Sequence, residues 1–230
     1  MEIIGAVFAR GGSKGIPKKN LCKINDLTLV EIALEKLIQS KLCKDIFLCS
    51  DDQEILNIET KLKYKKFKRN ANNCKDNSNE FDAWKELVHY LLNIKKFNKE
   101  DLLLITPTTS PLRKLKTIFG IVEKLKNNIS ADGIICIRES NWYPDFNLLR
   151  KDENNFLNTY LKVKRKVNRQ NSVKSWEMTT LAYCYKLDSI LKGNGIFELN
   201  TIGYNVTYPE CIDIDNKDDL DLARYLFKYE

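Results

Sequence analysis

The stretch VFARGGSKGIPKKNL, residues 7–21, joins an apolar segment to a loop with three glycines, four cationic side chains and one proline. The continuous apolar character of Ile3–Ala9 predicts a buried strand. Glycine lets a backbone approach a ligand closely and expose its N–H groups, and the cations supply the charge that attracts phosphate. The spacing matches neither the dinucleotide-binding fingerprint nor the P-loop. A flexible basic turn is the alternative, but the position of the loop directly after a strand favours phosphate binding.

Beyond this loop, apolar strand-like runs alternate with amphipathic helical stretches. The expected strands are Asp45–Ser50, Tyr64–Phe67, Asp101–Thr106 and Gly133–Ile137, and the expected helices are Leu29–Ile38, one that begins near Asp52, Phe81–Leu92 and Arg113–Leu125. This alternation predicts an α/β fold of the Rossmann-like, three-layer α/β/α kind with a mostly parallel sheet. In such sheets, ligands bind beyond the carboxyl ends of the strands.

The alternation breaks after residue 139. Four further elements are expected: antiparallel additions or an arm at Phe156–Lys164 and Thr180–Tyr185, a closing strand at Cys211–Asp215 and a final helix at Lys217–Tyr229. Because the chain shows no internal repeat and no low-complexity linker, we expect a single domain over residues 1–230, with residues 140–175 as an extension of it.

Composition argues against several classes of protein. Of the 230 residues, 43% are hydrophobic and 30% are charged, as in ordinary globular chains, and no apolar run reaches the roughly 18 residues that a membrane span needs. The seven cysteines form no C-x-x-C pair, which favours free thiols over zinc sites or disulfides. The single histidine, His89, has no obvious partner for a nucleophilic triad. Because no signal-peptide pattern follows Met1, we expect a cytoplasmic protein.

The formal net charge of +7 has two interpretations. Nucleic-acid binding is one of them. However, the basic groups do not repeat at a fixed period, and only the group at residues 63–69 contains aromatic side chains, Tyr64 and Phe67, which fit a short strand equally well. We favour lysines spread over solvated faces together with an anionic substrate. We therefore expect neither a nucleic acid nor a membrane as a partner.

Near the other end of the chain, the stretch CIDID contains two carboxylates with one residue between them, Asp213 and Asp215. On a strand both would point to the same face, where they repel each other unless a cation lies between them. Hard oxygen ligands suit Mg²⁺, or alternatively Mn²⁺, which can also bridge substrate phosphates. Helix capping is the alternative role, but Asn216, Asp218 and Asp219 can serve the following helix. We expect this pair and the glycine-rich loop to converge on one ligand.

Four other polar stretches are less specific. They are Ser50–Asp52, Arg69 with Asp76–Ser78, Pro107–Arg113, and Asn168–Gln170 followed by Trp176–Tyr183. Asp52 is expected to cap a helix, and Ser110 to cap the next one. Arg113 is the side chain in its loop that favours an anion.

Together these stretches resemble the acylneuraminate cytidylyltransferase family, which makes CMP-activated sialic acids and related ulosonic acids. The resemblance is carried by ARGGSKGIPKKNL, CSDDQEI, TSPLR, NRQ and DIDNKDDL, in family order from Ala9 to Leu220. The first and last motifs are the specific ones. The resemblance implies that CTP and a 2-keto-3-deoxy sugar acid, such as a sialic, legionaminic or other nonulosonic acid, react to give the CMP-sugar and pyrophosphate.

The resemblance also implies roles for individual residues. The nucleotide would be bound by Arg10, Gly11, Gly12, Ser13, Lys14, Lys19, Asn20, Asp51, Arg69 and Ser78, the sugar by Arg113, Arg169, Gln170, Thr179 and Tyr183, and the metal by Asp213 and Asp215. Arg10, Lys19, Asp213 and Asp215 would form the catalytic set. No covalent intermediate is expected, which agrees with the missing triad.

Two departures from the family pattern concern the sugar side. Pro107 and Thr108 stand where the family commonly has a glutamine–proline pair, and Thr179, Thr180 and Leu181 stand where it has asparagine–glycine–alanine. The resemblance further implies a homodimer, with the extension at residues 140–175 reaching into the partner's site. Two alternatives stay open: a nucleotidyltransferase that acts on a sugar 1-phosphate, and a non-catalytic nucleotide- or RNA-binding module.

Overall fold

The computed structural model describes residues 1–13, 15–70, 79–164 and 167–229. The chain forms two compact units, of which the larger combines Met1–Cys136 with Thr179–Glu230 and the smaller is Ile137–Met178. The chain passes from one unit to the other along two strands, β7 (Gly133–Glu139) and β10 (Trp176–Lys186).

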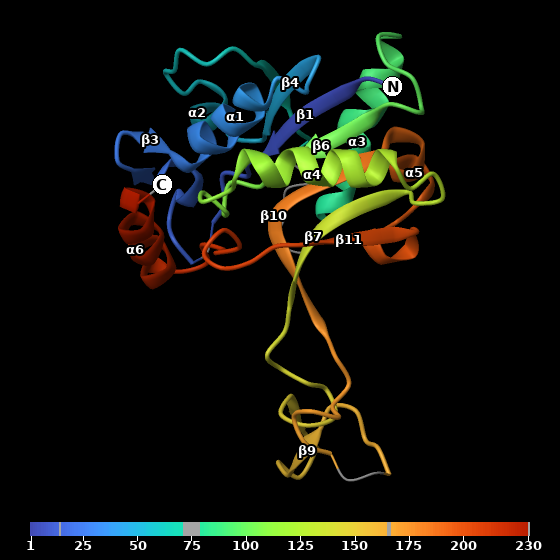
Figure 1. The fold of residues 1–230 in the computed structure, drawn as a ribbon. Coiled ribbons are helices and arrows are strands. Elements are labelled where there is room, and N and C mark those ends of the chain that lie inside the picture. Colours follow the sequence, from blue (N-terminus) through green and yellow to red (C-terminus); the bar gives the residue numbers. More distant parts are fainter. Residues whose placement is uncertain (14, 71–78, 165–166, 230) are drawn as a thin grey trace. The chain divides into compact units, whose positions relative to one another are not determined.

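The larger unit is built on a seven-stranded sheet with the strand order β11-β7-β10-β6-β1-β4-β5 (Figure 1). Its other strands are β1 (Ile3–Phe8), β4 (Asp45–Ser50), β5 (Lys65–Lys68), β6 (Leu102–Ile105) and β11 (Thr201–Asn205). β1 pairs in parallel with β4 and with β6, and β4 pairs in parallel with β5, whereas β10 runs antiparallel to β6. The predicted α/β fold with a mostly parallel sheet is therefore confirmed.

Helices cover both faces of this sheet (Figure 1). The helices of the larger unit are α1 (Leu29–Ser40), α2 (Gln53–Leu56), α3 (Glu80–Asn93), α4 (Leu115–Lys126), α5 (Leu187–Lys192) and α6 (Lys217–Leu226), of which α6 packs against α1. Because successive strand side chains point to opposite faces, β10 contacts both layers. Cys184 joins the apolar cluster that contains Ile121 of α4, whereas the Tyr183 ring lies 5.4 Å, centroid to centroid, from that of Trp84 on α3.

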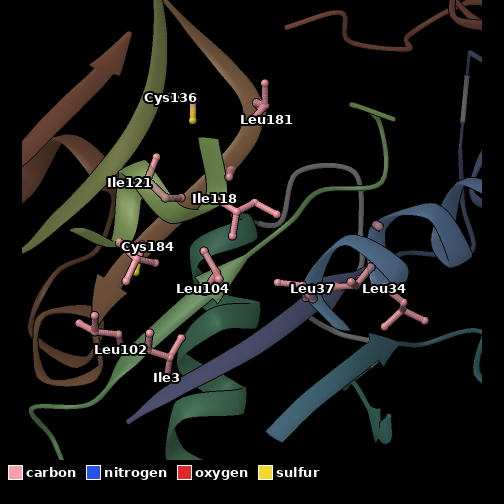
Figure 2. Close-up of a cluster of buried hydrophobic side chains, with 14 of the residues drawn as sticks. Ile3, Leu34, Leu37, Leu102, Leu104, Ile118, Ile121, Cys136, Leu181 and Cys184 are labelled. Carbon is pink, nitrogen blue, oxygen red and sulfur yellow. The ribbon is translucent and has the colours of Figure 1, made fainter. Parts of the chain in front are cut away.

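Figure 2 shows the principal apolar cluster of the larger unit. Its labelled members are Ile3, Leu34, Leu37, Leu102, Leu104, Ile118, Ile121, Cys136, Leu181 and Cys184, and each is at most 4% exposed. Full burial of one large aliphatic side chain contributes roughly 1.5–3 kcal/mol. This cluster ties β1 and β6 to α1 and α4, so the loops that follow the parallel strands are held at one edge of the sheet.

Side-chain caps set the start of three helices. Thr28 accepts from the Glu31 N–H while the Glu31 carboxylate accepts from the Thr28 N–H, which makes a capping box at the start of α1. Asn216 and Asp219 form the same arrangement at α6, as the sequence suggested. Asp52 caps α2 through the N–H groups of Glu54 and Ile55, which confirms its predicted role.

One predicted element is wrong. Residues 211–215 form no strand, and the preceding strand, β11, ends at Asn205. Their Ile-Asp-Ile-Asp alternation comes instead from an extended segment whose Ile212 and Ile214 are buried beside Leu29 and Ile32 of α1. An alternating pattern reports one buried face, and a lone extended segment produces it without any partner strand.

The strand β5 lies at an edge of the sheet and is rich in lysine. Lys65, Lys66 and Lys68 are all exposed. Charged side chains, lysine above all, keep an open sheet edge from pairing with another chain. Part of the positive charge of this protein therefore has a structural explanation.

The smaller unit contains an antiparallel pair of short strands, β8 (Leu149–Lys151) and β9 (Leu157–Thr159). The buried carboxylate of Asp145 accepts a hydrogen bond from the Val173 N–H at 3.0 Å. Ser140 donates to Glu177 at 2.7 Å, and Arg138 donates to the other oxygen of the same carboxylate at 2.6 Å. These contacts, between residues 28 to 39 positions apart, join the two ends of the unit.

None of the helices formed by the described residues has both the length and the apolar character to cross a bilayer. The six cysteines in the described part of the chain are free and buried or half-buried, as expected. Cys74 lies outside the described residues.

Candidate active site

Three loops meet where the parallel strands β1, β4 and β6 end. They contain Ala9–Lys18, Asp51–Asp52 and Thr106–Lys114. The Gly11 N–H donates to Asp51 Oδ1 at 3.1 Å, so the first loop is attached to the second. A Cβ atom on Gly11 would lie 2.5 Å from Asp52 Oδ2, which explains why glycine is needed there. Asp51, a predicted nucleotide ligand, thus also holds the glycine-rich loop in place.

Asn20 links the first loop to the third. Its Nδ2 donates to the Arg10 carbonyl at 2.8 Å, and its Oδ1 accepts from Thr108 Oγ1 at 2.6 Å. Both residues of the second bond are buried. Asn20 therefore holds the glycine-rich loop through the backbone of Arg10. A contact between Asn20 and the nucleoside stays a prediction.

The glycine-rich loop leads into a short 3-10 turn, η1 (Lys19–Leu21), through a residue with left-handed backbone geometry. That residue is Lys18, with φ 52°. Its exposed ammonium group lies 2.5 Å from Glu54 Oε2 on α2, and this hydrogen bond raises the pKa of Lys18 above its usual value. The loop is therefore held at two places, by the Gly11 hydrogen bond to Asp51 and by the Lys18 hydrogen bond to Glu54 on α2.

The C-terminal acidic segment also lies against the glycine-rich loop. Lys19 Nζ donates to the Ile214 carbonyl at 2.6 Å and lies 3.5 Å from Asp215 Oδ1. A Cβ atom on Gly15 would lie only 2.1 Å from the Asp215 carbonyl oxygen. The Ile214 N–H donates to the Thr109 carbonyl at 2.9 Å, which ties the segment to the third loop too. The expected convergence of the loop and the acidic pair is therefore present.

The two aspartates have different surroundings. Asp213 is half-buried, and its Oδ1 has no hydrogen-bond partner within the described part of the chain, whereas Asp215 is exposed. An unsatisfied buried carboxylate oxygen is costly unless a cation binds it. Together the two side chains fit a hard divalent cation that takes its other ligands from water and phosphate. No group of three or more metal-ligating side chains occurs among the described residues.

Arg113 is completely buried, with Nε donating to the Leu181 carbonyl and Nη2 donating to the Pro107 carbonyl, both at 2.5 Å. Its Nη1 has no hydrogen-bond partner within the described part of the chain. Burial lowers the pKa of Arg113 to about 10. In this structure Arg113 clamps the third loop to β10, and its contact with the sugar stays a prediction.

Arg69 lies at the same edge of the sheet as the three loops. Its guanidinium carbon is 5.9 Å from the centroid of the ring of Phe8, the last residue of β1. The backbone N–H of Arg69 donates to the Ser50 carbonyl at 2.9 Å. This position is compatible with the predicted nucleotide contact. The predicted ligands Lys14 and Ser78 lie outside the described residues.

The predicted sugar ligands are divided between the two units. Thr179 is buried and its hydroxyl donates to the Cys136 carbonyl at 3.1 Å. Tyr183 is buried, and its pKa is raised by this burial and further by the charges of Glu80 and Asp213. Arg169 and Gln170 are exposed residues of the smaller unit. Contacts of these four residues with a sugar stay predictions.

Sequence reasoning missed the polar contacts that hold the third loop. Thr109 Oγ1 donates to Thr180 Oγ1 at 3.1 Å, Ser110 Oγ lies 3.0 Å from the same oxygen, and Glu210 Oε1 accepts from the Lys114 N–H at 3.0 Å. Ser110 therefore does not cap α4, whose N-cap, Lys114, makes no side-chain capping bond. The partners are 70 to 96 positions apart, and no local pattern in the sequence pairs them.

These contacts bring three loops and the acidic segment together at the carboxyl edge of a parallel sheet, where ligands bind in folds of this kind. A family model described as cytidylyltransferase matches residues 4–224. The chain belongs to this cytidylyltransferase family, and the resemblance seen in its motifs is confirmed.

Curated relatives cover nearly the whole chain. It is 29% identical to the post-translational flagellin modification protein B of Campylobacter coli, over 99% of this chain and 95% of that protein. It is 27% identical to a CMP-N,N′-diacetyllegionaminic acid synthase of Campylobacter jejuni, over 98% and 94%, and 26% identical to a pseudaminic acid cytidylyltransferase of the same species, over 99% and 97%.

Solved structures share the fold. A CMP:2-keto-3-deoxy-manno-octonic acid synthetase complexed with CTP superposes with a TM-score of 0.73 at 12% identity, over 100% of this chain and 99% of that one. A 4-diphosphocytidyl-2C-methyl-D-erythritol synthase gives 0.69 at 12% identity, over 99% and 100%. At these identities the likeness concerns the fold alone.

The contact between Gly15 and Asp215 leads to a prediction that compares two glycines of the same loop. Gly15→Ala forces a Cβ onto a backbone oxygen, so we expect the free energy of unfolding to fall by about 1–3 kcal/mol. Gly12→Ala should leave stability within about 0.5 kcal/mol, because no atom of the described residues lies within 4 Å of the added Cβ, but should weaken CTP binding.

Urea unfolding and CTP titration measure the two effects separately. An equal loss of stability in the two variants would contradict the placement of Gly15 against the acidic segment.

Proposed function

We propose that this cytidylyltransferase transfers CMP from CTP to the anomeric hydroxyl of a nonulosonic acid and releases pyrophosphate. The observation that carries the proposal is the contact of Lys19 Nζ with the Ile214 carbonyl and Asp215 Oδ1. It brings a cation and the glycine-rich backbone against the segment that carries both carboxylates. Those are the groups that a triphosphate with a bound divalent cation requires.

In this proposal the glycine-rich loop holds the triphosphate. Arg10, Ser13, Lys14 and Lys19 bind its oxygens, and the N–H groups near Gly12 approach it where no side chain intervenes. Asn20, Asp51, Arg69 and Ser78 are assigned to the nucleoside side. Support for this division comes from the Asn20 and Asp51 hydrogen bonds, which keep the loop in a fixed shape before any ligand binds.

Asp213 and Asp215 would hold Mg²⁺ or Mn²⁺. The unpartnered buried oxygen of Asp213 supports this assignment. When bound, the ion would neutralise charge on the phosphates of CTP. Lys19 has a second role in this arrangement, because its ammonium group fixes the backbone of the acidic segment and so aims both carboxylates.

The reaction needs no covalent intermediate on the enzyme. The anomeric oxygen forms a bond to the α-phosphorus, the bond from that phosphorus to the bridging oxygen breaks, and pyrophosphate leaves with the electron pair. The hydroxyl proton goes to a carboxylate of the acidic pair or to water. The residues contribute by orienting the two substrates and by placing Arg10 and Lys19 where negative charge increases.

The identity of the acceptor is inferred from the relatives. Those that cover the chain from end to end include proteins named for diacetyllegionaminic acid and for pseudaminic acid, and one from Streptococcus agalactiae is named for N-acylneuraminate. All three are nonulosonic acids, so we assign the acceptor to this class. The departures at Pro107–Thr108 and Thr179–Leu181 lie on the side assigned to the sugar.

A pyrophosphate-release assay tests the reaction. Each of the four nucleoside triphosphates is combined with diacetyllegionaminic acid, pseudaminic acid, N-acetylneuraminic acid or a sugar 1-phosphate. We expect release only with CTP, Mg²⁺ and a nonulosonic acid. Release with the sugar phosphate would favour the alternative nucleotidyltransferase, and no release in any combination would favour a non-catalytic nucleotide-binding module.

The metal assignment predicts a large effect of removing either carboxylate. Asp213→Asn and Asp215→Asn should each lower turnover by about 100-fold or more, because a neutral amide binds a divalent cation poorly. Asp218→Asn, an exposed change in the first turn of α6, is the matched control and should keep normal turnover.

Mn²⁺ titration by calorimetry, in the presence of CTP, gives a readout that does not depend on turnover. Unchanged Mn²⁺ affinity in both variants would contradict the assignment of Asp213 and Asp215 as metal ligands.

We also propose that the protein is a homodimer formed through the smaller unit. Twelve of the 22 exposed large apolar side chains recorded for the described residues belong to its 42 residues: Trp142, Phe146, Leu148, Leu149, Phe156, Leu157, Tyr160, Leu161, Val163, Val173, Trp176 and Met178. Such a density of exposed apolar surface favours a protein interface.

Sedimentation should give twice the chain mass of 26.8 kDa for the wild type. The double variant Phe156→Asp with Leu157→Asp should sediment as a monomer, since a buried unpaired charge opposes association. The control is Ile129→Asp, which changes an 89% exposed residue of the larger unit. A wild-type monomer at micromolar concentration would contradict the proposal.

A further inference from the structure

Three hydroxyl groups form a small cluster where the third loop meets β10. Thr180 Oγ1 lies 3.1 Å from Thr109 Oγ1 and 3.0 Å from Ser110 Oγ, and Thr109 is the donor in the first pair. Ser110 is completely buried, whereas Thr109 and Thr180 are half-buried. Thr180 belongs to the segment in which this chain departs from the motif that it resembles.

Counting protons shows which way the cluster is oriented. A hydroxyl has one proton to donate and two lone pairs to accept with. If Thr180 donated to Ser110, the Ser110 proton would have no acceptor, because Ser110 makes no other hydrogen bond within the described part of the chain and has no access to water. A buried donor without an acceptor is costly. The favoured arrangement therefore has Ser110 and Thr109 both donating to Thr180.

In that arrangement both lone pairs of Thr180 are occupied and its own proton has no acceptor inside the cluster. Accepting two hydrogen bonds also polarises the Thr180 O–H bond and makes it a better donor. Thr180 is half-buried, so we expect solvent or a ligand to supply the acceptor for this proton. The result is a neutral donor whose direction is set before a ligand arrives.

The cluster is connected to the acidic segment. Thr109 contacts Thr180 through its side chain, and its carbonyl accepts the Ile214 N–H at 2.9 Å. Ile214 lies between Asp213 and Asp215 in the sequence. Arg113 binds the carbonyls of Pro107 and Leu181. Pro107 is two residues before Thr109 and Leu181 directly follows Thr180, so Arg113 also holds the two segments that form the hydroxyl contact. The Thr180 hydroxyl is thereby fixed relative to the carboxylates that would hold the metal.

We propose that Thr180 is a binding residue for the acceptor, and that its hydroxyl donates a hydrogen bond to the carboxylate on the anomeric carbon. The inference rests on the proposed function. In a 2-keto-3-deoxy sugar acid, the attacking hydroxyl and the carboxylate are bonded to the same carbon. A donor connected to the metal-binding segment through Thr109 therefore suits the carboxylate, the anionic substituent on the reacting carbon. Arg113, the cation of this loop, is fully buried, with Nε and Nη2 donating to backbone carbonyls and Nη1 without a partner among the described residues.

The test compares two substitutions at one position. Thr180→Val keeps the shape and removes the hydroxyl, so the KM for the acceptor should rise about tenfold while the KM for CTP stays unchanged. Thr180→Ser restores the donor and should return the KM to within about twofold of the wild type. Thr180→Ala gives the same comparison if valine overpacks the site.

The matched control is Thr201→Val on β11. It removes hydroxyl hydrogen bonds to Tyr185 and to the Ile196 carbonyl, so it should lower the melting temperature without changing either KM. The acceptor used is the one with the highest kcat/KM in the pyrophosphate-release assay. A wild type that releases no pyrophosphate contradicts the proposed function, whereas an active wild type with an unchanged KM in Thr180→Val contradicts this inference alone.

A chemical change in the acceptor tests the identity of the contacted group. The methyl ester of the acceptor is measured as a competitive inhibitor of the wild type and of Thr180→Val. If Thr180 binds the carboxylate, esterification should weaken binding to the wild type at least about fivefold more than binding to the variant. An equal loss in the two proteins would show that Thr180 contacts another part of the sugar and would overturn the assignment.

Discussion

The structure of the candidate site depends on the contact between Lys19 and the acidic segment near the C-terminus. Lys19 Nζ binds the Ile214 carbonyl across 195 positions of the sequence. The Lys19 side chain is only 16% exposed, so water screens its charge weakly, and a hydrogen bond that involves a charged group contributes about 1.5–3 kcal/mol. This contact holds the loop after β1 against the segment that contains Asp213 and Asp215.

A second constraint comes from the buried guanidinium group of Arg113. Placing a cation in the core is costly, and the cost is offset only when its donors find acceptors. Here Nε and Nη2 bind the carbonyls of Leu181 and Pro107, which belong to β10 and to the third loop, whereas Nη1 has no partner among the described residues. One buried charge thus holds in register two segments that carry hydroxyl groups.

Much of the fold follows from local patterns. Continuous apolar runs locate β1, β4 and β6 because these strands are buried on both faces, and the capping residues Thr28, Asp52 and Asn216 mark helix starts. The short helix α5 and the strand β11 were not predicted, since neither carries a strong periodic pattern. The wrong strand at Cys211–Asp215 came from real alternation, because Ile212 and Ile214 are buried against α1 without any strand pairing.

The sequence by itself determined the family, the alternation of strands and helices, and the two specific motifs, because each depends on residues close together in the chain. The tertiary structure decided which side chains are accessible and which polar groups meet. Folding made Arg113 a buried clamp between two segments and left one oxygen of Asp213 without a partner among the described residues, and it brought Thr180 to Ser110 across 70 positions. Accessibility and hydrogen bonding depend on atoms that are neighbours only after folding, and for that reason no local pattern could show them.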